Sequence, residues 1–240
     1  MVDNKVNVIM PMLGRGTRMD GIQDVCKPLM SLPDGDMFFL KSLSSLKNYD
    51  IQTLVLVVLE EYYEEFVNLY DKISEVTKAR KIIIIRHTAT KNVIETFRIG
   101  FKYFINSGAN KTIPLFCLDC DIYGEIPKFD KKYGECGRLF WFESDNPNKS
   151  YILTKEDAVV DKIEEKCVIS NKAVFGAYLF EDLILLYSSL LTDDVRNFEY
   201  ISDLFKFFLK YGNLVCASYV NNVINFGTIE EFKQYAEQKI

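Results

Sequence analysis

The chain has 240 residues, of which 48% are hydrophobic and 26% charged, and its formal net charge is -5. This composition is that of an ordinary globular protein and excludes a disordered or fibrous class. The acidic balance argues against nucleic acid as a partner, because nucleic-acid-binding domains usually carry a basic face. One domain spanning residues 1–240 is therefore expected.

The sequence predicts a cytoplasmic protein with no membrane partner. The N-terminus lacks the charged, apolar and cleavage segments of a signal peptide, and no apolar run is long enough to cross a bilayer. Six cysteines are scattered without the rhythm of a disulfide framework, so reduced thiols are expected.

Strand-like and helix-like segments alternate through the first half of the chain. In order they are a strand at 6–12, a helix at 37–46, a strand at 53–59, a helix at 61–73, a strand at 81–86, a helix at 93–104 and a strand at 113–119. This βαβα order predicts a mostly parallel sheet covered by helices. In such sheets the ligand crevice lies at the carboxyl ends of the strands.

The second half predicts antiparallel additions to that sheet. Short strands are expected at 137–144, 151–155, 158–163 and 172–180, followed by helices at 181–190 and 200–210, a strand at 213–220 and a final helix from Ile229. No repeat, low-complexity tract or linker divides the chain.

A loop rich in glycine and arginine follows the first strand. Gly14 and Gly16 would let the backbone turn tightly and point N–H groups at an anion, while Arg15, Arg18 and Lys27 add positive charge. The spacing fits neither a Walker A loop nor a dinucleotide-binding fingerprint. The residues thus indicate a polyphosphate site, with a plain surface turn as the alternative.

The stretch "PMLGRGTRM" followed by "KPL" resembles the signature loop of the nucleotidyltransferases that make sugar nucleotides, the pyrophosphorylase superfamily. The resemblance implies a three-layer α/β/α, Rossmann-like (GT-A-type) fold. It also implies catalytic roles for Arg18 and Lys27 at the reacting phosphates. The residues expected to bind the nucleotide in this loop are Met12, Leu13, Gly14, Arg15, Gly16 and Thr17.

The stretch "LFCLDCDIYG" places two carboxylates at the end of an apolar strand. Asp119 and Asp121 would lie on the same side if the strand continues, and Mg²⁺ bound to a nucleotide would relieve their repulsion. Aspartates of an ordinary turn are the alternative. By resemblance Asp121 becomes the magnesium ligand, and Asp119 supports the nucleotide.

Three later stretches also resemble the family. "KIEEKCVISNKAVFGAYLF" matches its acceptor-binding segment, which places Glu165, Lys166 and Gly176 against the acceptor. "EYISDLF" adds Glu199 to the acceptor site, and its Ser202 is alternatively the N-cap of the next helix. In "NVINFGTIEEF", Asn225 stands where the family has a metal-binding aspartate, so a neutral carbonyl oxygen replaces a charged ligand.

The loop after residue 87 departs from the pattern. Family members that use hexose phosphates carry a segment there that frames the base, whereas this chain has "TATKNVIETF". Thr88, Thr90 and Asn92 are the candidates for nucleotide contacts in this loop. The departure leaves both the base and the acceptor open.

The resemblance leads to a functional hypothesis with a defined reaction. A nucleotidyltransferase with Mg²⁺ as cofactor would join a nucleoside monophosphate from an NTP, with a slight lean to CTP, to a phosphorylated small molecule for surface polysaccharide or capsule precursors. Dimers are common in the family, so a homodimer is a further expectation.

Three alternatives remain. The enzyme could be a sugar-1-phosphate uridylyl- or thymidylyltransferase. "DCD" also fits the metal motif of GT-A glycosyltransferases, although these need no grip on a leaving pyrophosphate. Finally, Asn225 keeps a non-catalytic nucleotide-binding regulator under consideration.

Overall fold

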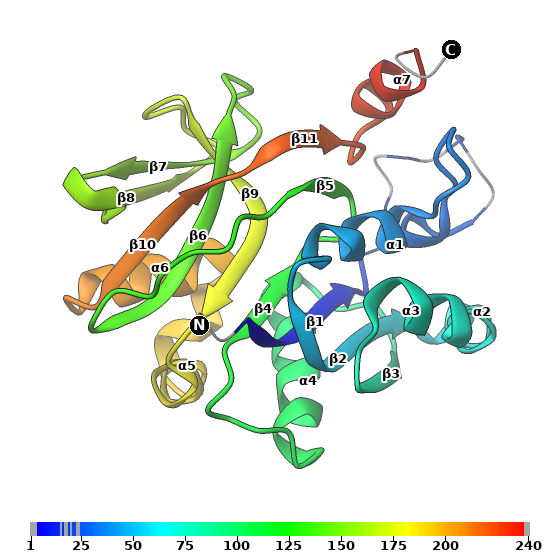
Figure 1. Cartoon of the computed structure of the whole chain (residues 1–240), viewed down its shortest axis with the longest axis horizontal. Helices are drawn as coiled ribbons and strands as arrows, with labels where there is room; N and C mark the ends of the chain where they lie inside the picture. Colours follow the sequence, from blue (N-terminus) through cyan, green and yellow to red (C-terminus); the bar gives the residue numbers. More distant parts are fainter. Residues whose placement is uncertain (1–3, 15, 17–18, 20, 23–24, 238–240) are drawn as a thin grey trace.

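The computed structural model describes residues 4–14, 16, 19, 21–22 and 25–237. The long sheet has the strand order β10-β6-β9-β4-β1-β2-β3 (Figure 1). These strands are β1 (Lys5–Met12), β2 (Asp50–Leu59), β3 (Lys81–His87), β4 (Leu115–Leu118), β6 (Glu135–Glu143), β9 (Lys172–Phe180) and β10 (Leu214–Tyr219). A hairpin of β7 (Ser150–Thr154) and β8 (Val160–Glu165) joins the sheet through β9.

Four of the six strand pairs along this order are parallel. β1 pairs in parallel with both β2 and β4, β2 with β3, and β6 with β10. β9 runs antiparallel to its neighbours β4 and β6. The predicted mixed, mostly parallel sheet with antiparallel additions in the second half is confirmed, and the carboxyl ends of β1 and β4 meet at one edge.

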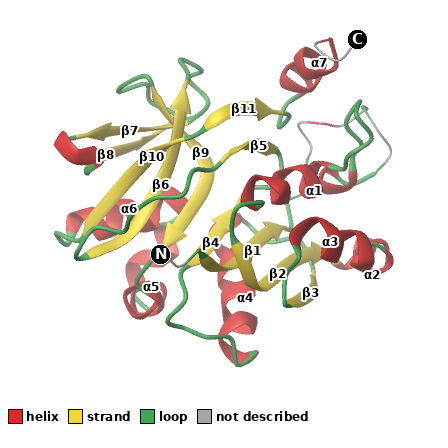
Figure 2. Ribbon diagram, viewed as in Figure 1, coloured by secondary structure: helices red, strands yellow, loops and turns green. Residues whose placement is uncertain are grey.

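Helices cover both faces of the sheet, as Figure 2 shows for the half around β1. On one face lie α4 (Val93–Asn106), α5 (Leu183–Leu190) and α6 (Ile201–Lys210), whose side chains pack into one hydrophobic cluster with strand residues such as Ile9 and Val55. On the other lie α1 (Phe38–Leu43), α2 (Tyr63–Asn68) and α3 (Tyr70–Thr77), which pack with Val8 and Leu56. The side chains of successive β1 residues therefore pack into the hydrophobic clusters on opposite faces of the sheet, as the two-residue period of a strand requires.

A small second sheet and a third cluster lie beside the main layers. β5 (Ile122–Glu125) pairs antiparallel with β11 (Asn221–Asn225), and α7 (Ile229–Glu237) follows directly. The Phe38 ring lies 4.8 Å from the Phe226 ring and 5.9 Å from the Phe232 ring. The last segment of the chain is thus anchored on the helix that follows the glycine-rich loop.

Three predictions of secondary structure need correction. The helix expected at 61–73 is two helices, because the backbone at Leu69 departs from helical geometry. The β5–β11 pair was not expected. Ser202 is not an N-cap: Tyr200 is the cap residue, and the Asp203 carboxylate accepts from the Tyr200 backbone N–H.

Two further observations complete the fold. All six cysteines are free. No helix within the described ranges is long and apolar enough to cross a membrane.

Candidate active site

A cavity of about 910 Å³ lies at the edge of the sheet where β1 and β4 end. Ten of the residues predicted from the sequence line it: Met12, Gly14, Gly16, Lys27, Asp119, Asp121, Glu165, Lys166, Gly176 and Asn225. They come from segments more than 200 positions apart, and the strand order explains their meeting. This is the strand-end crevice expected of a mostly parallel sheet.

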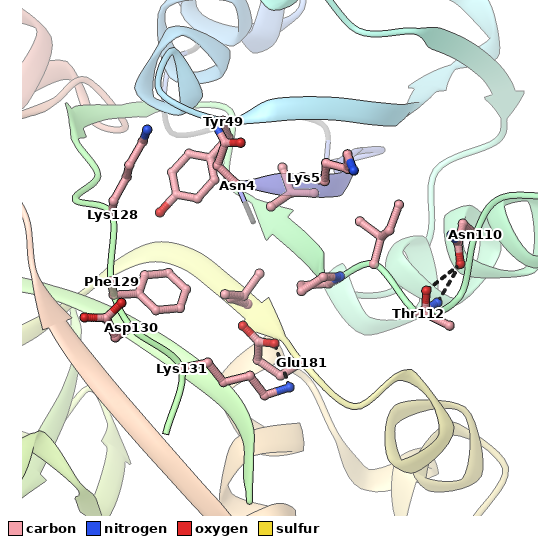
Figure 3. A pocket seen from close by; sticks show the side chains of 14 residues that line it. Asn4, Lys5, Tyr49, Asn110, Thr112, Lys128, Phe129, Asp130, Lys131 and Glu181 are labelled. Carbon is pink, nitrogen blue, oxygen red and sulfur yellow. Dashed lines mark hydrogen bonds and ion pairs between the residues drawn. The ribbon is translucent and has the colours of Figure 1, made fainter. Parts of the chain in front are cut away.

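Another hollow, of about 660 Å³, lies at the opposite edge, near the amino ends of β1 and β4 (Figure 3). Tyr49 and Phe129 line one part of it, and the ammonium of Lys131 lies 2.9 Å from the Glu181 carboxylate. Burial raises the pKa of Glu181, although Lys131 partly opposes that shift. No described site candidate lines this hollow, whereas ten of them line the strand-end cavity.

Lys27 is the buried cation of the cavity, with 8% of its side chain exposed. It begins the short 3₁₀ turn Lys27–Leu29, and its ammonium forms an ion pair with Asp121 and donates to the Gly227 carbonyl at 2.9 Å. Gly16 has φ +67°, and a Cβ on it would lie 2.6 Å from the Lys27 Cβ. Gly16 can therefore lie directly on Lys27 only because it lacks a side chain.

Asp119 and Asp121 do not share the face of one continuous strand. β4 ends at Leu118 and β5 begins at Ile122, so the two aspartates occupy the bend between them. Asp119 lies against β9, where its backbone N–H donates to the Gly176 carbonyl at 2.8 Å. Asp121 lies against the segment after β11, and its carbonyl accepts from the Phe226 N–H at 3.1 Å. Both still line the cavity.

The pKa of Asp119 is raised to about 7. Burial is the main cause, and the nearby Asp121 carboxylate adds to it, whereas the ammonium groups of Lys27 and Lys149 act in the opposite direction. Glu165 contributes a smaller upward push. A carboxyl in this position carries its charge readily only when a further cation is close.

Asn225 is held by a lysine that the sequence reasoning missed. The Lys149 ammonium donates to the Asn225 Oδ1 and to a Glu231 carboxylate oxygen, both at 2.9 Å. The other Glu231 oxygen accepts from the backbone N–H groups of Gly227 and Thr228 at 3.1 Å, ahead of α7. The spacing of Thr228 and Glu231 is that of a capping box and could have revealed this role; "NPNKS" around Lys149 reads only as a polar turn.

Glu165 and Lys166 lie at the end of β8. The Glu165 carboxylate accepts from the Ser150 hydroxyl and, at 3.0 Å, from the Ser202 hydroxyl. The Lys166 ammonium donates to the Tyr200 hydroxyl at 2.8 Å. Tyr200, which the sequence did not indicate, also lines the cavity, and Ser202 at the start of α6 holds the Glu165 carboxylate without lining the cavity itself.

Several predicted residues do not line the cavity. The side chain of Leu13 is buried in the core, and Glu199 is exposed ahead of α6. Thr88 is exposed, and the Thr90 hydroxyl contacts that of Thr96 at 2.6 Å. Asn92 caps α4 by accepting from the Glu95 N–H at 3.0 Å. Arg15, Thr17 and Arg18 lie outside the described residues.

The charges of the cavity suit a divalent cation. Five carboxyl groups and three ammonium groups belong to its described lining residues. Because carboxyl groups outnumber ammonium groups, a polyphosphate bound in this cavity would be repelled unless a cation is bound beside it. Asp121 offers the anionic oxygen that Mg²⁺ prefers, and Mg²⁺ commonly uses only one or two protein carboxylates together with phosphate oxygens and water. Among the described residues no group of three or more His, Cys, Asp or Glu side chains forms a metal cluster, so substrate oxygens would have to complete the shell.

Comparison with solved structures identifies the fold. The nucleoside-diphosphate-sugar pyrophosphorylase from Vibrio cholerae RC9 matches with a TM-score of 0.81 and 19% identity, over 96% of this chain and 100% of that one. The inositol-1-phosphate CTP transferase from T. maritima matches with a TM-score of 0.70 and 17% identity, over 100% and 97%. A UDP-glucose pyrophosphorylase complexed with UDP-glucose matches with a TM-score of 0.72 and 16% identity, over 98% of each chain.

No protein-family model matches the chain, and no curated protein matches it by sequence. The chain nevertheless has the Rossmann-like α/β fold of the nucleotidyltransferases, and the resemblance seen in its loops is confirmed at the level of the fold.

Proposed function

We propose that the protein is a Mg²⁺-dependent nucleotidyltransferase that joins a nucleoside monophosphate from an NTP to a phosphorylated small molecule and releases pyrophosphate. The observation that carries this proposal is the convergence of Gly14, Gly16, Lys27 and Asp121 in one cavity at the strand ends. The fold supports it, since the solved structures that share it are named as a nucleoside-diphosphate-sugar pyrophosphorylase and an inositol-1-phosphate CTP transferase.

The reaction would be an in-line displacement. An oxygen of the acceptor phosphate attacks the α-phosphorus of the NTP, the new P–O bond forms, and the bond to the β-phosphate breaks with its electrons leaving on pyrophosphate. Because the acceptor phosphate is already ionised near neutral pH, no general base is needed. The task of the protein is to align two anions and to neutralise their charge.

Different described residues would align the substrates and neutralise their charge. Lys27 would stabilise the charge that develops at the reacting phosphate, and the predicted partner in that role is Arg18. The Asp121 carboxylate would hold Mg²⁺, which supplies positive charge at the phosphates. Gly14 and Gly16 would let the loop backbone approach the triphosphate. Lys166 and Tyr200 would border the acceptor.

The proposed substrates follow the sequence expectation, with CTP as the favoured NTP and a phosphorylated sugar, alcohol or similar precursor of surface polysaccharide as the acceptor. The solved relatives in fold include one named as a CTP transferase and one complexed with UDP-glucose, so a uridylyl- or thymidylyltransferase is the second candidate. Dimerisation and magnesium dependence belong to the same proposal.

The test is a pyrophosphate-release assay with Mg²⁺, in which each NTP is paired with a panel of sugar 1-phosphates and other phosphorylated metabolites. We expect release that requires one NTP and one acceptor together. Release of a nucleoside diphosphate from a sugar nucleotide would replace the proposal with a glycosyltransferase. Nucleotide binding with no turnover across the panel would replace it with a non-catalytic regulator.

A further inference from the structure

Lys149 lines the cavity with an ammonium group that can donate a further hydrogen bond to a bound ligand. Its ammonium has two partners among the described residues, Asn225 and Glu231, although a lysine carries three N–H donors. Its side chain is 21% exposed and lines the main cavity. One donor is therefore available to a molecule bound there.

The partners of Lys149 leave it more positive than a simple ion pair would. The Glu231 carboxylate is shared with two backbone N–H groups ahead of α7, so Lys149 is not the only positive group that it meets. Asn225 contributes an oxygen without a negative charge. The carboxyl of Asp119 also lies within electrostatic range of Lys149, but burial raises its pKa to about 7, so that it carries less than a full charge near neutral pH.

A side pocket of about 270 Å³ continues from the cavity past Lys149. The residues that line both spaces are Asn146, Lys149, Asn225, Glu231 and Gln234. The other side-chain polar groups of the pocket come from Ser144 and Tyr235. An anion bound at Lys149 therefore has room beside it for a small polar group that can form hydrogen bonds.

The same geometry speaks against Asn225 as a ligand of Mg²⁺. Its only side-chain oxygen already accepts from the Lys149 ammonium at 2.9 Å. Since Mg²⁺ lies about 2.1 Å from its oxygen ligands, a metal on this oxygen would be at most about 5 Å from the ammonium. The two cations would repel each other, and a neutral amide does little to offset that. Asp121 differs, because a full negative charge offsets the repulsion between Lys27 and a metal bound to its carboxylate.

We propose that Lys149 binds the anionic group of the acceptor substrate, and that Asn225 orients this lysine instead of coordinating the metal. Naming the anion as the acceptor phosphate rests on the proposed function. The lysine and its two oxygen partners form one unit, which the chain builds from the β6–β7 turn, the end of β11 and the first turn of α7. The acceptor is accordingly a small anionic molecule with a polar remainder.

Anion binding is tested by titrating inorganic phosphate into the purified protein saturated with Mg²⁺ and a non-hydrolysable CTP analogue. Lys149→Gln should weaken phosphate binding by about 10-fold or more, the loss expected for one charge-assisted hydrogen bond, and Lys149→Arg should recover part of it. Lys162→Gln is the matched control, because Lys162 pairs with Glu164 on β8 and does not line the cavity. Equal phosphate affinity in Lys149→Gln and Lys162→Gln would overturn the inference.

The role of Asn225 is tested by Mn²⁺ binding, followed by electron paramagnetic resonance. Asn225→Ala should leave Mn²⁺ affinity within about 2-fold of the wild type, whereas Asp121→Asn should weaken it by about 10-fold or more. If Asn225→Ala weakened Mn²⁺ as much as Asp121→Asn did, or if Asn225→Asp tightened it strongly, Asn225 would be a metal ligand and the inference would be wrong.

These measurements do not depend on turnover. A wild-type protein that binds the CTP analogue but releases no pyrophosphate would contradict the proposed function, whereas the phosphate and Mn²⁺ titrations would still decide the roles of Lys149 and Asn225.

Discussion

At the scale of single residues, the contact between Gly176 and Asp119 makes a sharp prediction. Gly176 has φ +83°, and a Cβ added to it would lie 2.5 Å from an Asp119 carboxylate oxygen. Gly176→Ala should therefore displace Asp119 from the cavity as well as strain the backbone of β9. We expect nucleotidyl transfer to fall by about 10-fold or more and the free energy of unfolding to fall by about 1–3 kcal/mol.

Gly108→Ala separates these two effects. Gly108 has a similar φ, +75°, but a Cβ there would meet nothing within 4 Å. This variant should show the backbone strain in urea unfolding and keep wild-type pyrophosphate release. A comparable loss of turnover in both variants would mean that the Asp119 contact does not matter.

Lys27 is the residue whose removal should damage the chemistry most directly. Lys27→Ala deletes the ammonium that contacts Asp121 and the Gly227 carbonyl beside the glycine-rich loop. Turnover should fall by about 100-fold or more, because the transition-state charge on the phosphates loses its fixed cation. Steady-state kinetics of pyrophosphate release would measure this. The same loss is expected for Arg18→Ala.

Lys41→Ala is the matched control for Lys27→Ala. Lys41 is also a partly buried lysine, with ion pairs to Asp34 at 2.8 Å and Asp36 at 3.1 Å, but it does not line the cavity. Its loss should lower the melting temperature and leave turnover within about 2-fold of the wild type. Normal turnover in Lys27→Ala would remove Lys27 from the catalytic assignment.

At the scale of elements, the start of α6 couples helix capping to the acceptor side of the cavity. The Asp203 carboxylate accepts from the backbone N–H groups of Glu199 and Tyr200, and the Tyr200 hydroxyl accepts from Lys166. Asp203→Ala should cost about 1 kcal/mol of stability through the lost cap. By loosening Tyr200, it should also raise KM for the acceptor while KM for the NTP stays unchanged.

Asp182→Ala tests whether that KM effect is specific. Asp182 caps α5 by accepting from the N–H groups of Ile184 and Leu185, and it does not line the cavity. It should cost a similar amount of stability in chemical denaturation without moving either KM. If both variants raised the acceptor KM equally, the effect would reflect general destabilisation.

The helices and strands that the sequence predicts best are those whose hydrophobic pattern lies within the element itself. The apolar runs of β2 and β3 and the amphipathic α4 can be identified from neighbouring residues alone. β5 and β11 cannot be predicted from local sequence patterns, because each is short and mixed in polarity. Each is stabilised by pairing with residues about 100 positions away. This pairing places Asn225 opposite Ile122, beside Asp121, so the fine structure of the site depended on an element that local patterns do not show.

At the scale of the whole molecule, some residues of the candidate site can be predicted from sequence motifs, whereas others are revealed only by tertiary contacts. Lys27 and Asp121 follow strand ends with motif-like spacing, and the fold brings both to the cavity. Lys149 lies in a polar turn that reaches the cavity only because β7 pairs with β8 and β9. Its role depends on tertiary contacts with Asn225 and Glu231, which no spacing in the sequence predicts.

The C-terminal helix is tied to the N-terminal half by a pH-sensitive contact. Asp34 accepts from Lys41 at 2.8 Å and from the Tyr235 hydroxyl of α7 at 2.7 Å. Burial alone would raise the pKa of Asp34, but the hydrogen bonds from Lys41 and Tyr235 outweigh it, so the pKa lies below its ordinary value. Burial and the same hydrogen bond raise the pKa of Tyr235 to about 12, so the hydroxyl stays a donor through neutral pH.

This shift predicts how stability depends on pH. A carboxyl whose pKa is lower in the folded state contributes fully above its unfolded pKa of about 4 and loses that contribution as the pH falls through the folded value. Asp34→Asn should therefore reduce the free energy of unfolding by at most about 1 kcal/mol between pH 5 and 8, and the difference from the wild type should shrink below about pH 4. Urea unfolding of both proteins from pH 3 to 8 would measure it, with Tyr235→Phe as a variant that removes one hydrogen bond but keeps the carboxylate. A difference that stayed constant down to pH 3 would mean that the charge of Asp34 does not stabilise the contact between the two ends of the chain.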